Sequence, residues 1–166
     1  MFHQWVAFYQ LTGAAAASLI GLLFIVATLS SRQSDGPASG VRLFLTPMVF
    51  HLALVLAVSA VALAPSLKGP APAALMGLFA VTACAYAVPV ALGVARIQDP
   101  THWSDAWYYG AAPVAADLAL AVASASAWAG WSHAGDAVAL TVLAILLLAI
   151  RNAWDLVTWL SARRAP

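Results

Sequence analysis

Polar and charged side chains interrupt the apolar stretch LLLAIRNAWDLVTWL at residues 146–160. Arg151, Asn152 and Asp155 lie within five residues of one another, and Arg151 and Asp155 share a helical face because they are four residues apart. A charge at the centre of a membrane costs at least about 2.5–3.5 kcal/mol on insertion scales, so each of these charges needs a partner. The pattern indicates either a site that handles ions, protons or polar solutes, or a structural ion pair.

Three other apolar stretches carry polar side chains at a similar depth. Counting from the nearer membrane face at 1.5 Å per helical residue places His51 at about 10 Å, Tyr86 at about 13 Å and Asp117 at about 16 Å. The same count places Arg151 at about 15 Å and Asp155 at about 9 Å. We therefore predict one polar layer in the inner half of the bilayer. Within it, we expect Asp117 to hold Arg151 and His51 to lie beside Asp155.

Three prolines lie near the same membrane face: Pro47, Pro89 and Pro113. Each is predicted to kink its helix, because proline has no N–H and clashes with the preceding turn. The backbone carbonyls left without their usual donors are those of Leu43, Ala85 and Tyr109. In a membrane such carbonyls need a substitute partner or a hydrated cavity.

The composition indicates a membrane protein. Of the 166 residues, 64% are hydrophobic and 8% charged, and the mean hydropathy is +0.91, whereas soluble domains carry roughly 25% charged residues. A helix needs about 20 apolar residues to cross a bilayer. We predict an all-α transmembrane bundle, a single domain with five membrane-spanning helices at residues 4–30, 42–64, 72–95, 106–128 and 137–160.

The basic residues predict the orientation of this bundle. With five spans, one side of the membrane carries Arg32, Arg42, Arg96, Arg163 and Arg164, and the other carries Lys68. The positive-inside rule then places the N-terminus outside and the C-terminus in the cytoplasm. Several tryptophans fall near predicted span ends, as interfacial anchors do: Trp5, Trp103, Trp107, Trp128, Trp131 and Trp159. The high alanine content favours a bacterial protein, hence the inner membrane.

Gly13, Ala17 and Gly21 are spaced four apart in the first span and form a stripe of small residues. Such stripes allow close approach of two membrane helices. The partner is either another span or a second copy of the chain. Because five helices enclose little interior, a pore is easier to build between subunits, and we expect a homo-oligomer.

Several classes of function are excluded or disfavoured. The sequence has no glutamate, so the H-E-x-x-H zinc motif is absent, and its one cysteine, Cys84, forms no disulfide within the chain. The net charge of +1 gives no basic field for nucleic acid, and no glycine-rich loop is present to bind phosphates. We expect no enzymatic activity, no cofactor and no metal, with the lipid bilayer and other copies of the chain as partners.

Three functions stay open. The first is a homo-oligomeric channel for ions or protons, or a small-solute transporter, that uses the polar layer. The second is a non-catalytic accessory or scaffold subunit of a larger membrane complex, in which the charges are structural. The third is a membrane redox protein that binds haem or a metal through His51. The remaining histidines fall outside the spans or at their ends: His3, His102 and His133.

Overall fold

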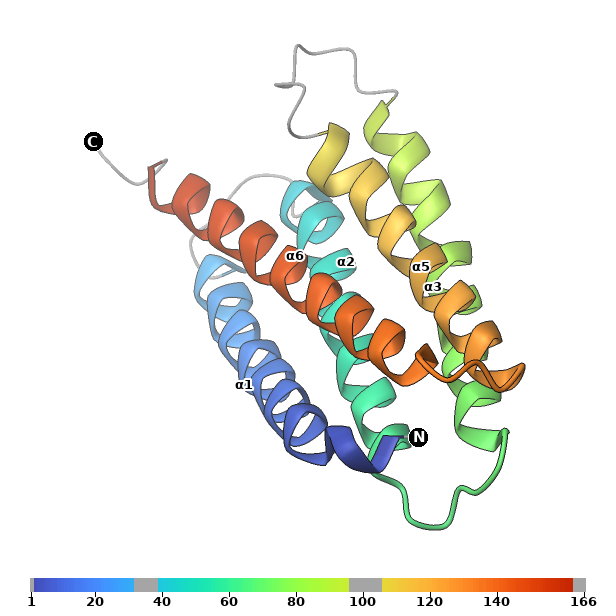
Figure 1. Cartoon of the computed structure of the whole chain (residues 1–166). Helices are drawn as coiled ribbons and strands as arrows, with labels where there is room; N and C mark the ends of the chain where they lie inside the picture. The colour runs from blue at the N-terminus through green and yellow to red at the C-terminus, as the bar shows by residue number, and fades with distance from the viewer. Residues whose placement is uncertain (1, 32–38, 96–105, 163–166) are drawn as a thin grey trace.

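The computed structural model describes residues 2–31, 39–95 and 106–162, which form helices joined by short turns (Figure 1). Within these ranges there is no β-strand, which confirms the predicted all-helical fold. Five of the helices are long and apolar enough to cross a membrane. The protein is therefore a small multi-pass integral membrane protein, and the orientation of its termini stays a prediction.

The helices follow the apolar stretches of the sequence. A short 3₁₀ turn, η1 (Phe2–Trp5), leads into the first helix, and a π-helical segment, η2 (Ala106–Ala111), leads into the fourth. The long helices are α1 (Val6–Ser31), α2 (Ser39–Leu63), α3 (Ala71–Ala95), α5 (Ala112–Trp128) and α6 (Ala134–Ala162). They agree with the predicted spans to within a few residues, because the length of the apolar run defines both.

The helices pack as an antiparallel bundle. α1 lies along α2, α3 lies along α5, and α6 crosses in front of them in contact with α2, α5 and α1 (Figure 1). Gly69 and Gly130 occupy the turns before α3 and α6 with φ angles of 60° and 80°, which side chains other than glycine rarely adopt. Because of this packing of the helices, the interior is lined mainly by α2, α3, α5 and α6.

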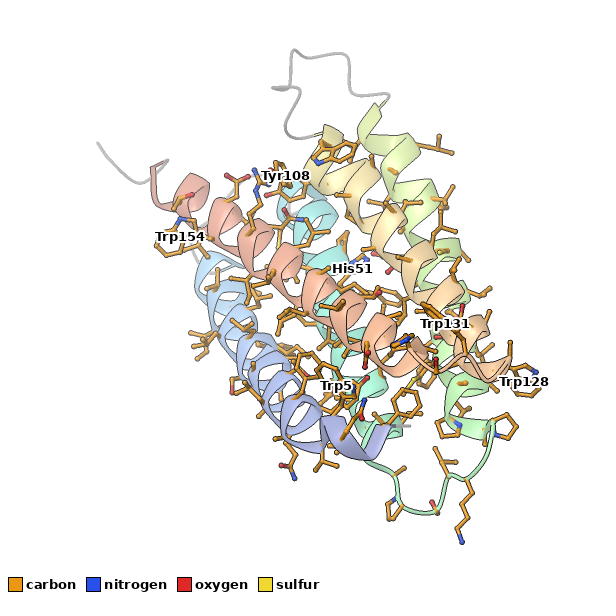
Figure 2. All side chains as sticks on the ribbon, in the orientation of Figure 1. Trp5, His51, Tyr108, Trp128, Trp131 and Trp154 are labelled. Carbon is orange, nitrogen blue, oxygen red and sulfur yellow. The ribbon has the colours of Figure 1, made fainter. Side chains whose placement is uncertain are left out.

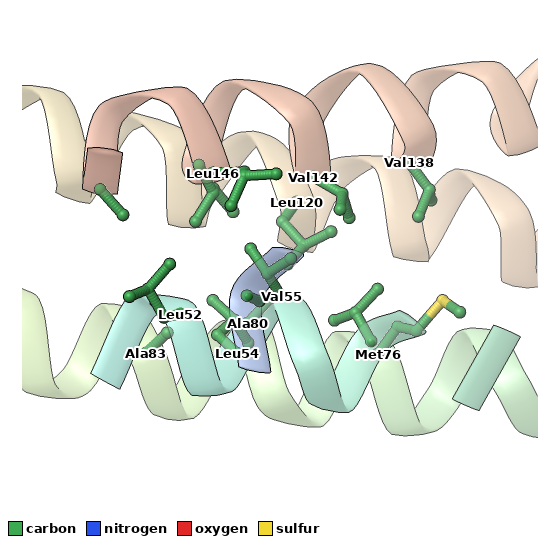
Figure 3. Packing of buried hydrophobic residues seen from close by; sticks show 14 of the residues in the cluster. Leu52, Leu54, Val55, Met76, Ala80, Ala83, Leu120, Val138, Val142 and Leu146 are labelled. Atoms are coloured by element: carbon green, nitrogen blue, oxygen red, sulfur yellow. The ribbon is translucent and has the colours of Figure 1, made fainter. Parts of the chain in front are cut away.

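The apolar core receives one large, fully buried side chain from each long helix: Tyr9, Leu52, Met76, Leu120 and Ile145. Valines from α2 and α6, among them Val55 and Val142, fill the space between them (Figure 3). Many large apolar side chains on the outer faces of the helices are exposed, as expected for surfaces that contact lipid.

Exposed tryptophans mark the two ends of the bundle. Trp154 lies toward the end where α6 finishes, and Trp128 and Trp131 lie toward the opposite end (Figure 2). Their exposed fractions of 52–70% suit an interfacial position. Trp5 differs, because its Nε1 donates to the Asp136 carboxylate at 3.2 Å. Trp103 and the side chain of Trp159 lie outside the described residues.

The arginines that predict the orientation also lie outside the described part of the chain. This applies to Arg32, Arg96, Arg163 and Arg164, and to the side chain of Arg42. The structure therefore places all the predicted cytoplasmic ends at one end of the bundle but does not test which compartment they face (Figure 1).

The small-residue stripe of α1 is only partly a packing face within this chain. A Cβ atom built on Gly13 would lie 3.2 Å from the Ser59 Cβ on α2, so Gly13 allows these two helices to approach closely. Ala17 and Gly21 are exposed, and a Cβ on Gly21 would meet nothing within 4 Å. Of the two partners left open for the stripe, another span of this chain meets Gly13 only, because the buried face of α1 turns toward Ala16, and packing against a second copy stays a prediction.

The three prolines occupy two different settings. Pro47 and Pro89 lie inside α2 and α3. Pro113 lies in the first turn of α5, directly after η2. The chain accommodates Pro113 with a π-helical turn before it, and such turns are frequent at functional sites.

Candidate functional site: a buried proton-sharing pair in the polar layer

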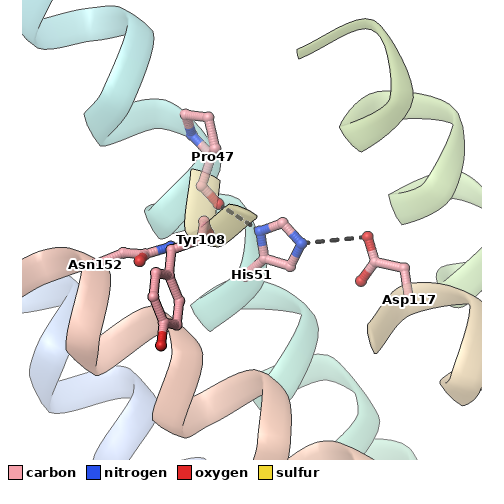
Figure 4. Close-up of polar contacts among 5 residues, drawn as sticks. All are labelled: Pro47, His51, Tyr108, Asp117 and Asn152. Carbon is pink, nitrogen blue, oxygen red and sulfur yellow. Dashed lines mark hydrogen bonds and ion pairs between the residues drawn. The ribbon is translucent and has the colours of Figure 1, made fainter. Parts of the chain in front are cut away.

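His51 is held in place by its own helix. Its Nδ1 lies 2.8 Å from the backbone carbonyl oxygen of Pro47, one turn earlier on α2. A carbonyl oxygen only accepts hydrogen bonds, so Nδ1 carries a proton and donates it. This contact fixes the orientation of the ring and directs Nε2 across the interior toward α5 (Figure 4).

His51 Nε2 meets the carboxylate of Asp117. Nε2 and the Asp117 Oδ2 are 3.2 Å apart, and the two side chains are 7% and 0% exposed. Because Nδ1 already holds its proton, the contact requires one more proton between Nε2 and Oδ2. Either His51 is an imidazolium beside a carboxylate, or a neutral His51 accepts from a protonated Asp117. Both arrangements have zero net charge, so the pair can share a proton inside the membrane without a counter-ion.

The other oxygen of Asp117, Oδ1, takes no part in sharing this proton. Oδ1 is buried and has no hydrogen-bond partner among the described residues. Cys84 on α3 interacts electrostatically with the same carboxylate. Asp117 therefore has an acceptor position that a second proton or a water molecule can use.

A small cavity lies beside the pair. It has a volume of about 20 Å³ and is lined by residues of α2, α3, η2, α5 and α6, including His51, Tyr109, Pro113 and Asn152. A buried site needs roughly 10–15 Å³ on this measure to hold one water molecule, together with polar partners. The cavity is therefore large enough for about one water molecule and too small for a larger solute.

Asn152 replaces a backbone donor that Pro113 removes. Its Nδ2 donates to the carbonyl oxygen of Tyr108 at 2.9 Å. Tyr108 lies five residues before Pro113, so continuing the π-helical pattern would require an N–H that proline lacks. The side chain of Asn152 thus ties α6 to η2, and it satisfies a carbonyl that would otherwise be unpaired within the membrane.

Arg151 lies beside the contact between α6 and η2. Its guanidinium carbon is 3.6 Å from the centre of the Tyr108 ring, and its Nη1 donates to the Asn152 Oδ1 at 3.1 Å. The prediction that Asp117 holds Arg151 is wrong, since one oxygen of Asp117 faces His51 and the other has no partner. An aromatic ring and an amide carry the arginine, through cation–π attraction and one hydrogen bond.

Asp155 pairs with Tyr109, whose side chain was not among the predicted site residues. The Tyr109 hydroxyl donates to the Asp155 Oδ2 at 2.9 Å and lies 3.2 Å from the backbone oxygen of Asn152. The predicted contact of Asp155 with His51 is wrong, because Pro47 and Asp117 occupy both ring nitrogens. Only the carbonyl of Tyr109 was considered from the sequence, although its position four residues before Pro113 placed its side chain in the same layer.

Tyr86 stands outside this network. Its ring packs against Phe50, with 4.5 Å between the ring centres, and its side chain is only partly buried. The structure thus joins five of the six predicted polar residues into two neighbouring groups. His51 and Asp117 form the proton-sharing pair, while Arg151, Asn152 and Asp155 gather around the two tyrosines of η2.

The opposite half of the bundle contains fewer polar contacts. Thr12 and Ser59 share a hydrogen bond of 3.2 Å between α1 and α2. In the first turn of α6, Asp136 accepts from Gln4 and Trp5, and His133 Nδ1 lies 3.6 Å from the other oxygen of Asp136. These contacts fasten η1 to the start of α6.

Metal or haem binding finds little support in these contacts. Across the described ranges, no three histidine, cysteine or acidic side chains gather as metal ligands would. The side chain of His3 lies outside the described residues. His51 would have to leave Asp117 before its Nε2 could bind iron.

The chain matches no protein-family model, no curated protein and no solved structure at a significant level. The geometry of the polar layer alone therefore supports the proposals that follow.

Proposed function

We propose that this integral membrane protein moves protons across the bacterial inner membrane, as a small homo-oligomeric channel or transporter. The observation that carries the proposal is the His51–Asp117 pair, which is buried and must hold one proton between its two side chains. Ionisable groups inside membranes are costly and typically mark pathways for ions or protons. Histidine suits this role because its unperturbed pKa of about 6.5 lies near physiological pH.

The size of the cavity favours a proton over a larger permeant. A volume of about 20 Å³ beside His51 admits roughly one water molecule. A hydrated cation or an organic solute would need a wider path than this chain provides by itself. A proton needs only groups within hydrogen-bonding distance, as His51 and Asp117 are, or groups that one water molecule can join, and Tyr109 lines the same cavity as His51.

The structure corresponds to a closed state in this proposal. Beyond the pair, toward the opposite end of the bundle, the interior is filled by Leu52, Val55, Leu120, Val138 and Val142, all at most 1% exposed. Passage of a proton across the whole membrane requires these side chains to separate and admit water. The π-helical turn η2 interrupts the α-helical hydrogen-bonding pattern directly before α5, and such turns are frequent at functional sites.

Self-association is the second part of the proposal. Ala17 and Gly21 leave small, exposed positions on α1, a face that a second copy can approach closely.

Proton flux from purified protein in liposomes tests the proposal. With a potassium gradient, valinomycin and an internal pH-sensitive dye, the wild-type protein should acidify or alkalinise the vesicles faster than empty liposomes do. Asp117→Asn should abolish this difference, because an amide cannot exchange a proton with His51. Tyr86→Phe is the matched control and should retain wild-type flux. Wild-type vesicles that behave like empty ones in both directions of the gradient would contradict the proposal.

An accessory role in a larger membrane complex is the second candidate. The tightly packed apolar half of the interior favours it, because a purely structural bundle needs no path across the membrane. Purification from the native membrane in mild detergent separates the two. A stoichiometric larger partner, together with absent flux from the pure protein, would favour the accessory role.

A further inference from the structure

The cluster around Asp155 and Tyr109 lies between the proton-sharing pair and one end of the bundle. Asp155 is partly exposed and belongs to the last turns of α6, while Tyr109 belongs to η2 at the start of the α5 segment. The Tyr109 hydroxyl donates to Asp155 at 2.9 Å, and the Tyr109 side chain also lines the cavity that His51 lines. Tyr109 therefore contacts a partly exposed carboxylate through its hydroxyl and also borders the cavity beside the buried pair.

Among the described residues, apolar side chains come first in the direction of the opposite end. On α2 the next buried side chains after His51 are Leu52, Leu54 and Val55, and on α5 Leu120 follows Asp117, while the buried hydroxyls of Ser59 and Ser124 come about two turns beyond the pair. Apolar side chains cannot pass a proton between hydrogen-bonding groups. Within the described part of the chain, the polar groups nearest the pair therefore lie toward the end at which α6 terminates, and apolar side chains border the pair on its other side.

We infer that protons reach the His51–Asp117 pair from that end through Asp155, the Tyr109 hydroxyl and one water molecule in the cavity. This inference rests on the proposed handling of protons and adds its route and sidedness. Asp155 exchanges a proton with bulk water. Tyr109 then accepts that proton on its oxygen as its own hydroxyl proton passes to the water, which releases one to the pair. Each oxygen gains one O–H bond and loses one, so no other reactant is needed.

The charged and titratable groups around the route are few. Asp117 on α5 shares the proton, and Cys84 on α3 interacts with Asp117. On α6, Asp155 is the outer acceptor. Arg151 is not among the residues that line the cavity, and its guanidinium contacts the Tyr108 ring and the Asn152 amide oxygen. Arg151 therefore takes no part in the relay.

Hydrogen–deuterium exchange at His51 tests the route without relying on flux. The full-length protein is labelled with ¹⁵N-histidine, placed in nanodiscs and transferred to D₂O, and the ring N–H signals of His51 are assigned with His51→Gln. Tyr109→Phe removes the hydroxyl and should slow exchange at Nε2 by about tenfold or more. Asp155→Asn retains an acceptor for Tyr109 but cannot carry a proton, and should slow exchange as well. Tyr86→Phe, a tyrosine outside the network, should exchange at the wild-type rate.

The outcomes separate this inference from the proposed function. Wild-type exchange rates in both Tyr109→Phe and Asp155→Asn would overturn the route, even if the liposomes conduct protons. Slow exchange in both variants would support the route even if the pure protein conducts none, and the pair would then be a proton-binding site open to one side. If Tyr109→Phe does not fold, Asp155→Asn decides alone.

Discussion

At the scale of single residues, the central feature is a histidine with both ring nitrogens engaged. Pro47 fixes the tautomer of His51, and this in turn makes the contact with Asp117 depend on one shared proton. Whether a substituted side chain can still hydrogen-bond to the His51 Nε2 therefore decides whether the contact is preserved. An amide and an alkyl group at position 117 should behave differently, although both remove the carboxylate.

Asp117→Asn should fold with a stability near that of the wild type, because the amide N–H can donate to the His51 Nε2. Asp117→Leu leaves that buried nitrogen without a partner and should lower the free energy of unfolding by about 1–3 kcal/mol. Thermal unfolding of the two variants in detergent measures the difference. Equal losses of stability in both would show that the hydrogen bond to His51 contributes nothing.

His51→Phe removes the partner of a fully buried carboxylate. Breaking one side of a buried charged pair typically costs about 3–5 kcal/mol, whereas replacing both partners with apolar groups is often close to neutral. The double variant His51→Phe/Asp117→Leu should therefore be more stable than His51→Phe alone. Denaturant unfolding of both variants checks this, and additive losses would indicate that the two side chains act independently.

At the scale of helices, the junction between η2, α5 and α6 depends on a side-chain N–H that replaces a missing backbone N–H. Pro113 removes a backbone N–H, and Asn152 supplies a side-chain N–H to the Tyr108 carbonyl. One helix therefore lacks a hydrogen-bond donor at Pro113, and Asn152 on another helix supplies one.

This compensation predicts coupling between Pro113 and Asn152. Asn152→Ala should cost about 1–3 kcal/mol in the wild-type background, since the Tyr108 carbonyl loses its partner. Pro113→Ala restores an N–H that can serve the carbonyls of η2, so Asn152→Ala should cost less in that background. A double-mutant cycle measured by unfolding gives the coupling energy. A value near zero would mean that Asn152 acts only through Arg151.

The two glycines of the α1 stripe should respond differently to enlargement. Gly13→Leu drives a side chain into Ser59 of α2, and overpacking of this kind costs about 1–3 kcal/mol. Gly21→Leu meets nothing within the chain and should leave stability unchanged, but it should weaken self-association. Unfolding curves and the oligomer mass in mild detergent measure the two effects. An unchanged mass in Gly21→Leu would show that this face contacts lipid.

At the scale of the whole molecule, the polar layer lies nearer one end of the bundle than the other. The ends of α3 and α6 and the beginnings of α2 and α5 meet at that end (Figure 1). The compartment that this end faces determines from which side the proposed proton site is loaded.

The distribution of basic residues predicts that this end is cytoplasmic. A reporter fused to the C-terminus should remain in the cytoplasm, and one fused to the N-terminus should be exported. Paired fusions of alkaline phosphatase and green fluorescent protein measure this. If both termini report the same side, the chain does not cross the membrane five times.

The number and limits of the apolar helices could be predicted from the sequence, and so could the gathering of polar residues toward one end of the bundle. Both follow from properties that run along one dimension, the length of an apolar run and the rise per residue. Asp117 and Arg151 share a depth, yet they are not paired, because depth does not specify which way a side chain faces around its helix. In the same way, four-residue spacing identified a face of α1 but did not reveal that this face turns away from α2 after Gly13.

The partners of the polar side chains depend on the packing of the helices. α2 packs against α6 and α3 and lies across the interior from α5, and this arrangement gives Asp117 to His51, the Tyr108 ring to Arg151 and the Tyr109 hydroxyl to Asp155. The π-helical turn before Pro113 also depends on tertiary contact, because its free carbonyl is satisfied from another helix. A buried polar group in a membrane takes whichever partner the packing of neighbouring helices places within reach, and that choice is made in three dimensions.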